Sequence, residues 1–218
     1  MKKNLTELVC ILDRSGSMRG MEKDTIGGYN AMLERQRAVD GECVQTTVLF
    51  DHRYELLHDR IDLRAVSPST EKQYVVGGST ALLDAIGQTL HKIAAVQKNT
   101  AEDYRAEKVL FLIITDGEEN ASRHYDAAHI KRMIQRQQER YGWEFLFLGA
   151  NIDAVETAGQ FGIGADRAAE YVPDGQGTEL NFRMMSQAVA SFRERGAVPS
   201  ACLDAIRNDM KKRGGRGR

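Results

Sequence analysis

The sequence predicts an α/β fold: a doubly wound, Rossmann-like sheet of six mostly parallel strands, with one antiparallel edge strand and helices on both faces. Two observations predict this fold. Short apolar or β-branched runs alternate along the chain with segments of helical periodicity, as in repeated βαβ units. The runs at residues 8–12 and 108–115 are also continuous in their apolar character, which is typical of central parallel strands buried on both faces.

The elements of the first half follow from local patterns. After the strand at residues 8–12, residues 21–39 place apolar side chains at helical spacing and predict a helix. Residues 43–50 are rich in β-branched side chains, which favour a strand. A tight turn at residues 51–53 would then return the chain as a strand at residues 54–58, antiparallel to the one before it.

The second half continues the alternation. A helix is expected after Gly78-Ser79-Thr80, because apolar residues from Leu83 to Ile93 recur at helical spacing. The strand at residues 108–115 follows. The remaining expected elements are a helix at 127–140, a strand at 143–148, a helix at 152–161, a short strand at 168–172, and helices at 178–195 and 200–212.

Size and charge limit the classes of function. With 218 residues, 42% of them hydrophobic, the chain is long enough for a well-buried core in one domain. The formal net charge of −1 gives no sign of a nucleic-acid-binding surface. Residues 211–218 form a basic Gly/Arg tail, which we interpret as a solubilising segment, with weak contact to nucleic acid as the alternative.

Cysteine usage and the length of the apolar runs bear on the compartment. Three widely spaced cysteines, Cys10, Cys43 and Cys202, are an odd number without a metal-binding spacing, so we expect small buried side chains in a reducing environment. The first apolar run ends at Asp13 and is too short for a signal peptide. No run approaches the roughly 20 residues that span a bilayer. We therefore expect a cytoplasmic protein that makes no contact with a membrane.

Oxygen-bearing side chains gather at one predicted edge of the sheet. In open parallel sheets, the ligand site lies beyond the carboxyl ends of the strands. Carboxylate and hydroxyl oxygens at such an edge suit a hard cation such as Mg²⁺. The residues in question are Asp13, Ser15 and Ser17 after the first strand, Thr80 after the glycine loop, and Asp116 after the strand at residues 108–115.

These five residues, in this chain order and with these flanking strands, resemble the metal-ion-dependent adhesion site of the von Willebrand factor type A family. The resemblance covers roughly residues 5–172 and looks like a stand-alone bacterial or phage-type member. It implies a type A domain that we place at residues 1–198, followed at residues 199–218 by a C-terminal helix and the Gly/Arg tail.

The resemblance also implies that some of these residues contact the metal directly and that others act through water. Ser15, Ser17 and Thr80 would contact Mg²⁺ directly, with Mn²⁺ and Ca²⁺ as alternative ions. Asp13 and Asp116 would act largely through water. Because the direct ligands would be neutral, the ion would keep most of its charge and accept one more anionic oxygen.

The function implied is capture of a protein partner without a chemical reaction, so no catalytic residue is assigned. An Asp or Glu carboxylate of the partner would complete the metal's coordination. The family resemblance suggests ring ATPases or stress-response assemblies as partners. Residues that we expect near the partner are Arg14, Gly78, Ser79, Glu118, Glu119 and Asn151.

Two alternatives stay open. A metal-dependent hydrolase or phosphatase could use the same ion to activate water. It would need a general base near the ion, and the sequence offers no convincing one. A nucleic-acid adaptor acting through residues 211–218 is the other alternative.

Overall fold

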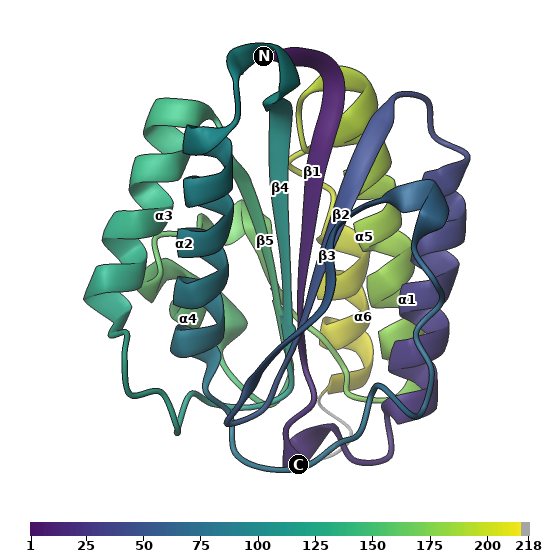
Figure 1. Ribbon diagram of the computed structural model, residues 1–218. Helices are drawn as coiled ribbons and strands as arrows, with labels where there is room; N and C mark the ends of the chain where they lie inside the picture. Colours follow the sequence, from purple (N-terminus) through teal and green to yellow (C-terminus); the bar gives the residue numbers. More distant parts are fainter. Residues whose placement is uncertain (215–218) are drawn as a thin grey trace.

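The chain folds around one six-stranded sheet in the order β3-β2-β1-β4-β5-β6 (Figure 1). The computed structural model describes residues 1–214, so residues 215–218 of the predicted Gly/Arg tail lie outside the described part. Only β3 is antiparallel to its neighbour, which confirms the predicted fold class. The strands are β1 (Lys2–Asp13), β2 (Glu42–Phe50), β3 (Tyr54–Asp62), β4 (Ala106–Thr115), β5 (Glu144–Gly149) and β6 (Ala168–Glu170).

Helices cover both faces of the sheet (Figure 1). On one face lie α2, α3 and α4, and on the other lie α1, α5 and α6. The helices are α1 (Glu22–Arg37), α2 (Leu82–Asn99), α3 (Ala127–Tyr141), α4 (Ala154–Gln160), α5 (Gly175–Arg195) and α6 (Asp204–Arg213). Short 3-10 turns lie at Gly16–Met18, Leu63–Ala65, Glu102–Tyr104 and Ala165–Arg167.

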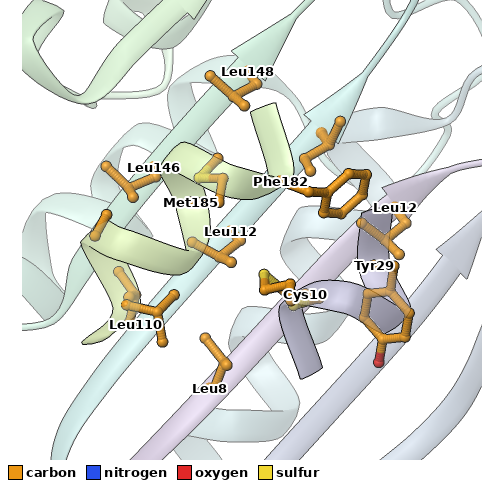
Figure 2. Close-up of a cluster of buried hydrophobic side chains, with 14 of the residues drawn as sticks. Leu8, Cys10, Leu12, Tyr29, Leu110, Leu112, Leu146, Leu148, Phe182 and Met185 are labelled. Atoms are coloured by element: carbon orange, nitrogen blue, oxygen red, sulfur yellow. The ribbon is translucent and has the colours of Figure 1, made fainter. Parts of the chain in front are cut away.

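The continuous apolar runs have a simple structural cause. Successive side chains of a strand point to opposite faces, so a strand covered on both faces needs apolar residues at every position. In β1, Leu8 and Cys10 face the core beside α1 and α5, whereas Val9 and Ile11 face the core beneath α2. Figure 2 shows the first of these cores, where Met185 of α5 lies among side chains of the central strands.

Strand ends are less well predicted than strand centres. β1 begins at Lys2, six positions before the predicted run, and β3 continues to Asp62. The added residues at the start of β1 and the end of β3 are largely polar, so they carry no continuous apolar signal although they pair in the sheet, and Thr6 and Glu7 of β1 are buried. β6 is shorter than predicted and ends at Glu170.

Side-chain caps shift two helix starts. Asp174 accepts a hydrogen bond from the Gly177 amide at 2.7 Å, so α5 begins at Gly175 and not at residue 178. Asp153 accepts from the Glu156 amide at 2.8 Å and begins α4 at Ala154. The last helix, α6, begins at Asp204, four positions after its predicted start.

The predicted burial of the cysteines is confirmed for two of the three residues. Cys10 and Cys43 are buried and Cys202 is half-buried, and all three are free thiols.

At the C-terminal end, Arg213 belongs to α6 and forms ion pairs with Asp174 and Asp209. Within residues 1–214, no helix has the length and apolar character needed to cross a membrane.

Gly27 and Gly28 of α1 provide a matched test of the packing between α1 and α5. A β-carbon added at Gly28 would lie 2.3 Å from a ring carbon of Phe182 in α5, whereas one added at Gly27 would have nothing within 4 Å. We expect Gly28→Ala to lower the free energy of unfolding by about 1–3 kcal/mol through overpacking. Gly27→Ala should raise it by up to about 1 kcal/mol, because alanine is the better helix former. Urea unfolding measures both, and a Gly28→Ala variant as stable as wild type would contradict this packing.

Candidate metal centre

The carboxyl ends of β1 and β4 bring Asp13 and Asp116 together. The two strands are parallel neighbours, with Leu12 of β1 opposite Ile114 of β4. β1 ends at Asp13, and Asp116 directly follows the last residue of β4. This edge of the sheet is at the bottom of Figure 1, where the predicted ligand edge lies.

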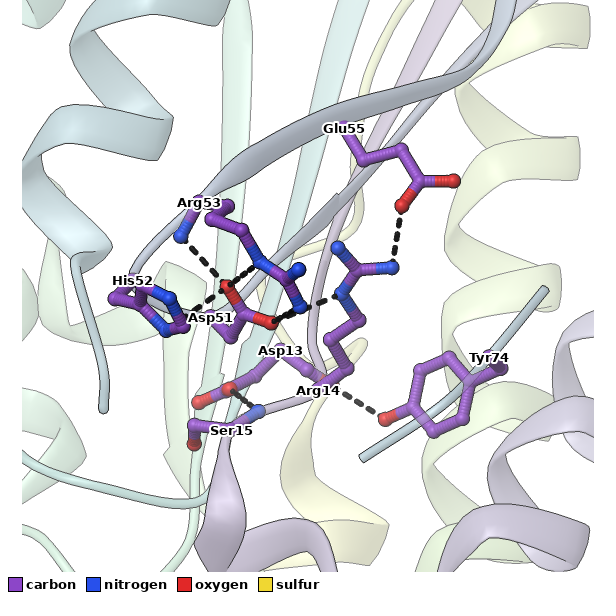
Figure 3. Close-up of polar contacts among 8 residues, drawn as sticks. All are labelled: Asp13, Arg14, Ser15, Asp51, His52, Arg53, Glu55 and Tyr74. Carbon is purple, nitrogen blue, oxygen red and sulfur yellow. Dashed lines mark hydrogen bonds and ion pairs between the residues drawn. The ribbon is translucent and has the colours of Figure 1, made fainter. Parts of the chain in front are cut away.

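Asp13 is a buried carboxylate held by neutral donors. Its Oδ1 accepts from the Ser15 amide at 2.6 Å (Figure 3). Its Oδ2 accepts from the Thr115 hydroxyl at 2.6 Å. Burial raises the pKa of Asp13, and the hydrogen bonds from Thr115 and Ser15 oppose that rise. The charged form is therefore disfavoured where the side chain lies.

The charged form of Asp116 is also disfavoured. Burial and the charge of Asp13 together raise the pKa of Asp116 to about 6, although the hydrogen bond from Asn151 opposes the rise. The Asn151 amide donates to Oδ1 of Asp116, from a residue whose φ of 56° is in the left-handed region. Within residues 1–214, neither Asp13 nor Asp116 forms an ion pair with a basic side chain.

Three hydroxyl groups converge beside these carboxylates. The Ser15 and Ser17 hydroxyl oxygens lie 3.0 Å apart. A β-carbon added at Gly117 would lie 3.2 Å from the Ser17 hydroxyl oxygen and 3.4 Å from that of Thr80, so both hydroxyls approach the same glycine. All five predicted metal residues therefore lie at one edge of the sheet.

The oxygen spacing fits a hard divalent ion. Adjacent ligands of an octahedral Mg²⁺ ion are about 2.9 Å apart, from bond lengths of 2.0–2.1 Å, and the separation of the Ser15 and Ser17 oxygens agrees with that value. Residues 1–214 contain no group of three or more His, Cys, Asp or Glu side chains that could hold a metal. A site here would depend on hydroxyl oxygens, with Asp13 and Asp116 supplying the negative charge. That donor set suits Mg²⁺, Mn²⁺ or Ca²⁺, and the identity of the ion stays a prediction.

Gly16 joins the loop after β1, which carries Ser15, to the loop before α2, which carries Thr80. The Gly16 amide donates to the Gly78 carbonyl oxygen at 2.9 Å, and a β-carbon at Gly16 would lie 3.3 Å from that oxygen. Gly78 has a φ of 77°, which favours glycine. A side chain at Gly16 would press on the loop that carries Thr80, and a β-carbon at Gly78 would lie 2.3 Å from Nδ1 of His52.

Asp51 is a hub that the sequence analysis missed. It is fully buried, lies 3.5 Å from Nε of Arg14, and accepts from Arg53 at 2.9 Å (Figure 3). Its carbonyl oxygen accepts from the Ala81 amide at 2.9 Å. Burial acts to raise the pKa of Asp51, but hydrogen bonds from Arg53 and the charge of Arg14 outweigh it and lower the pKa. Asp51 thereby ties the loop after β1 to the loop before α2.

The residues expected near a partner divide into two groups. Gly78, Ser79, Glu118 and Asn151 are exposed, and Asn151 also holds Asp116. Arg14 and Glu119 have internal partners. Arg14 is 5% exposed and donates to Glu55 at 2.5 Å besides its contact with Asp51. Both carboxylate oxygens of Glu119 accept hydrogen bonds from within the chain, so the side chains of Arg14 and Glu119 are engaged internally and not directed to a partner.

Two buried tyrosines support the strand ends from the side of α1 and α5. The Tyr74 hydroxyl donates to the Asp13 carbonyl oxygen, and the Tyr171 hydroxyl donates to the Thr115 carbonyl oxygen at 3.4 Å. Both hydroxyls reach across many residues of sequence, so no local pattern could have indicated them.

Solved structures with the same architecture include von Willebrand factor type A proteins. A von Willebrand factor type A protein from Catenulispora acidiphila matches over 85% of this chain and 42% of its own, with a TM-score of 0.58 and 16% identity. Proximal thread matrix protein 1 from the mussel byssus, with a zinc-occupied MIDAS motif, matches over 85% and 46%, with a TM-score of 0.59 and 12% identity. The manganese-loaded TRAP protein of Plasmodium vivax matches over 68% and 58%, with a TM-score of 0.51 and 21% identity.

These matches show likeness of fold. This chain spans about half the length of the solved chains, between 42% and 58% in these three. No protein-family model matches the sequence, and no curated protein matches it.

The raised pKa of Asp116 makes the metal-free protein sensitive to pH. A carboxyl group with an ordinary pKa of 3.8 and a folded-state pKa of about 6 contributes stability that is present below about pH 4 and lost as the pH rises to about 6. Asp116→Asn removes this titration. In EDTA, the free energy of unfolding of the variant minus that of wild type should therefore increase from pH 4 to pH 6 and then level off. Urea unfolding at each pH measures the difference, and a constant difference would show that Asp116 is not held in a disfavoured charged form.

Proposed function

We propose that this chain, which has the fold of the von Willebrand factor type A domains, is an interaction module that captures an acidic side chain of a protein partner through one divalent ion. One observation carries the proposal. Asp13 and Asp116 are buried together without a basic counter-ion within residues 1–214, directly beside the hydroxyls of Ser15, Ser17 and Thr80. A bound cation would offset both buried charges and would find its oxygen ligands in place.

The choice of ligands supports capture of an anion. Hydroxyl ligands are neutral, so they leave the charge of a divalent ion uncompensated by its direct ligands. Asp13 and Asp116 already accept hydrogen bonds from Thr115, Ser15 and Asn151, which suits them to hold water or hydroxyl groups rather than to surround the ion. The ion would then attract a carboxylate from outside the chain.

The surroundings of the site also suit a partner that approaches from solvent. Ser17, Gly78, Ser79 and Asn151 are exposed at this edge. Among the similar structures, the mussel protein carries zinc in its MIDAS motif and the Plasmodium protein carries manganese. We propose Mg²⁺ as the ion here, because the donors are hard oxygens, with Mn²⁺ and Ca²⁺ as alternatives.

The proposal also includes the location of the protein and the class of its partner. We propose a cytoplasmic location, and we propose a partner that presents an Asp or Glu carboxylate, such as a component of a ring ATPase or a stress-response assembly. No chemical step is assigned to the ion in this proposal.

Affinity capture tests the proposal. Wild type and an Asp13→Ala/Ser15→Ala variant are each used to retain proteins from a host lysate, once with Mg²⁺ and once with EDTA. We expect a partner to be retained only by wild type in Mg²⁺, because the variant loses one direct ligand and one buried charge. Loss of a supporting carboxylate alone costs about 10–100-fold in metal affinity. Changing the acidic side chains of the retained partner to amides should then abolish capture.

Thr100→Ala provides the control. Thr100 follows the C-terminal end of α2, whereas the loop that carries Thr80 precedes the helix. The Thr100 hydroxyl donates to the Val96 carbonyl oxygen in the last turn of α2. This variant should behave as wild type in both buffers. If the same proteins are retained by all three chains with and without metal, metal-bridged capture is wrong, and the ion would have to be tested as a catalytic or structural centre.

A further inference from the structure

The loop that follows Asp116 is fixed to the first turn of α2 by an unusual series of hydrogen bonds. Residues 119–125, which we name the clamp loop, present five consecutive backbone amides to carboxylates. Glu119 takes the first two, since its Oε1 accepts from the amides of Ala121 at 2.9 Å and Ser122 at 2.7 Å. Its Oε2 accepts from the Leu83 amide in α2 at 2.8 Å.

Asp84 of α2 takes the next three amides. Its Oδ2 accepts from the Arg123 amide at 2.9 Å, and its Oδ1 accepts from the amides of His124 at 2.9 Å and Tyr125 at 3.0 Å. The Asp84 amide in turn donates to the Ser122 hydroxyl oxygen at 2.9 Å. The clamp loop and the start of α2 therefore satisfy each other's backbone groups.

Tyr125 adds close packing to these hydrogen bonds. A β-carbon added at Gly87 of α2 would lie 2.5–2.6 Å from three ring carbons of Tyr125. The ring therefore lies flat against the bare backbone of α2, one turn beyond Asp84. Such contact between a ring and a glycine leaves the loop little freedom to move along the helix.

Asn120 connects the clamp loop to a predicted metal ligand. Its side-chain Oδ1 accepts from the Thr80 amide at 2.9 Å, and its own amide donates to the Thr80 carbonyl oxygen at 3.0 Å. The Ala121 amide donates to the same carbonyl oxygen at 3.2 Å. Both peptide groups of Thr80 are thus held by the loop that carries Asp116, and so the position of the Thr80 hydroxyl depends on Asn120.

We propose that Asn120 is a positioning residue for the metal site, which holds Thr80 beside Asp116, and that Glu119 and Asp84 keep Asn120 in place. This inference rests on the proposed metal-binding function. Asn120 is exposed, and removing its side chain leaves no cavity in either core. Without the Asn120 side chain, however, the Thr80 amide has no acceptor at this position. Thr80 can then rotate away from Ser17 and Gly117.

Isothermal titration with Mg²⁺ alone tests the inference. We expect Asn120→Ala to weaken Mg²⁺ binding about 10-fold or more, the range found for residues that orient metal ligands. Asn120→Asp keeps the acceptor for the Thr80 amide and should bind Mg²⁺ at least as tightly as wild type. Gly87→Ala, which displaces Tyr125, should weaken binding in the same direction as Asn120→Ala.

A stability control separates positioning from general loosening. Val189→Ala removes methyl groups from the buried face of α5 and should lower the melting temperature without changing Mg²⁺ affinity. In the metal-free protein, hydrogen exchange at the Thr80 amide should be faster in Asn120→Ala than in wild type and normal in Asn120→Asp. This second readout does not depend on bound metal.

The outcomes are distinct. If wild type binds Mg²⁺ and Asn120→Ala binds it equally tightly, the positioning role is wrong while the proposed function stands. If Asn120→Ala and Val189→Ala weaken binding to the same extent, the effect follows stability and the positioning role is likewise wrong. If wild type binds no divalent ion, the proposed function and this inference both fail.

Discussion

The carboxylates of Asp13 and Asp116 are buried side by side at the ends of β1 and β4, where the charge of one disfavours the charge of the other. Burial of an unpaired charge is costly, and a protein offsets it with protonation, a basic partner or a metal ion. No basic side chain pairs with either group within residues 1–214. The same edge offers hydroxyl oxygens at the spacing of ligands on a hard cation. The proposed function follows from this electrostatic constraint.

Such a site works only if three separate loops keep their relative positions. Two hubs of ion pairs and hydrogen bonds connect these loops in pairs. Asp51 links the loop after β1 to the loop before α2, through Arg14 and the Ala81 amide. Asn120 links the loop before α2 to the loop after β4 through Thr80. Because neither hub uses a predicted metal ligand as its centre, the ligand oxygens stay free while their backbones are fixed.

The sheet, and the gathering of the five candidate metal residues at one edge of it, could be predicted because both depend on local pattern. Continuous apolar runs follow from burial on both faces, as for Val9 and Cys10 in β1, and the candidate metal residues stand directly after strands and loops. Contacts between residues far apart in sequence could not be predicted. Asn120 bonds to a residue 40 positions away, and Arg14 pairs with Glu55 at a separation of 41. Arg14 was expected near the partner, yet its side chain is buried and pairs with Glu55 of β3.

We propose above that one divalent ion binds among the hydroxyls of Ser15, Ser17 and Thr80. Anomalous X-ray diffraction from crystals grown with Mn²⁺ tests it most directly, because the ion is located independently of any partner or activity. We expect a single strong anomalous peak in contact with these three hydroxyl oxygens, close to Asp13 and Asp116. If the five residues keep this arrangement but Mn²⁺ lies elsewhere, or is absent at saturating concentration, the proposed metal site is wrong.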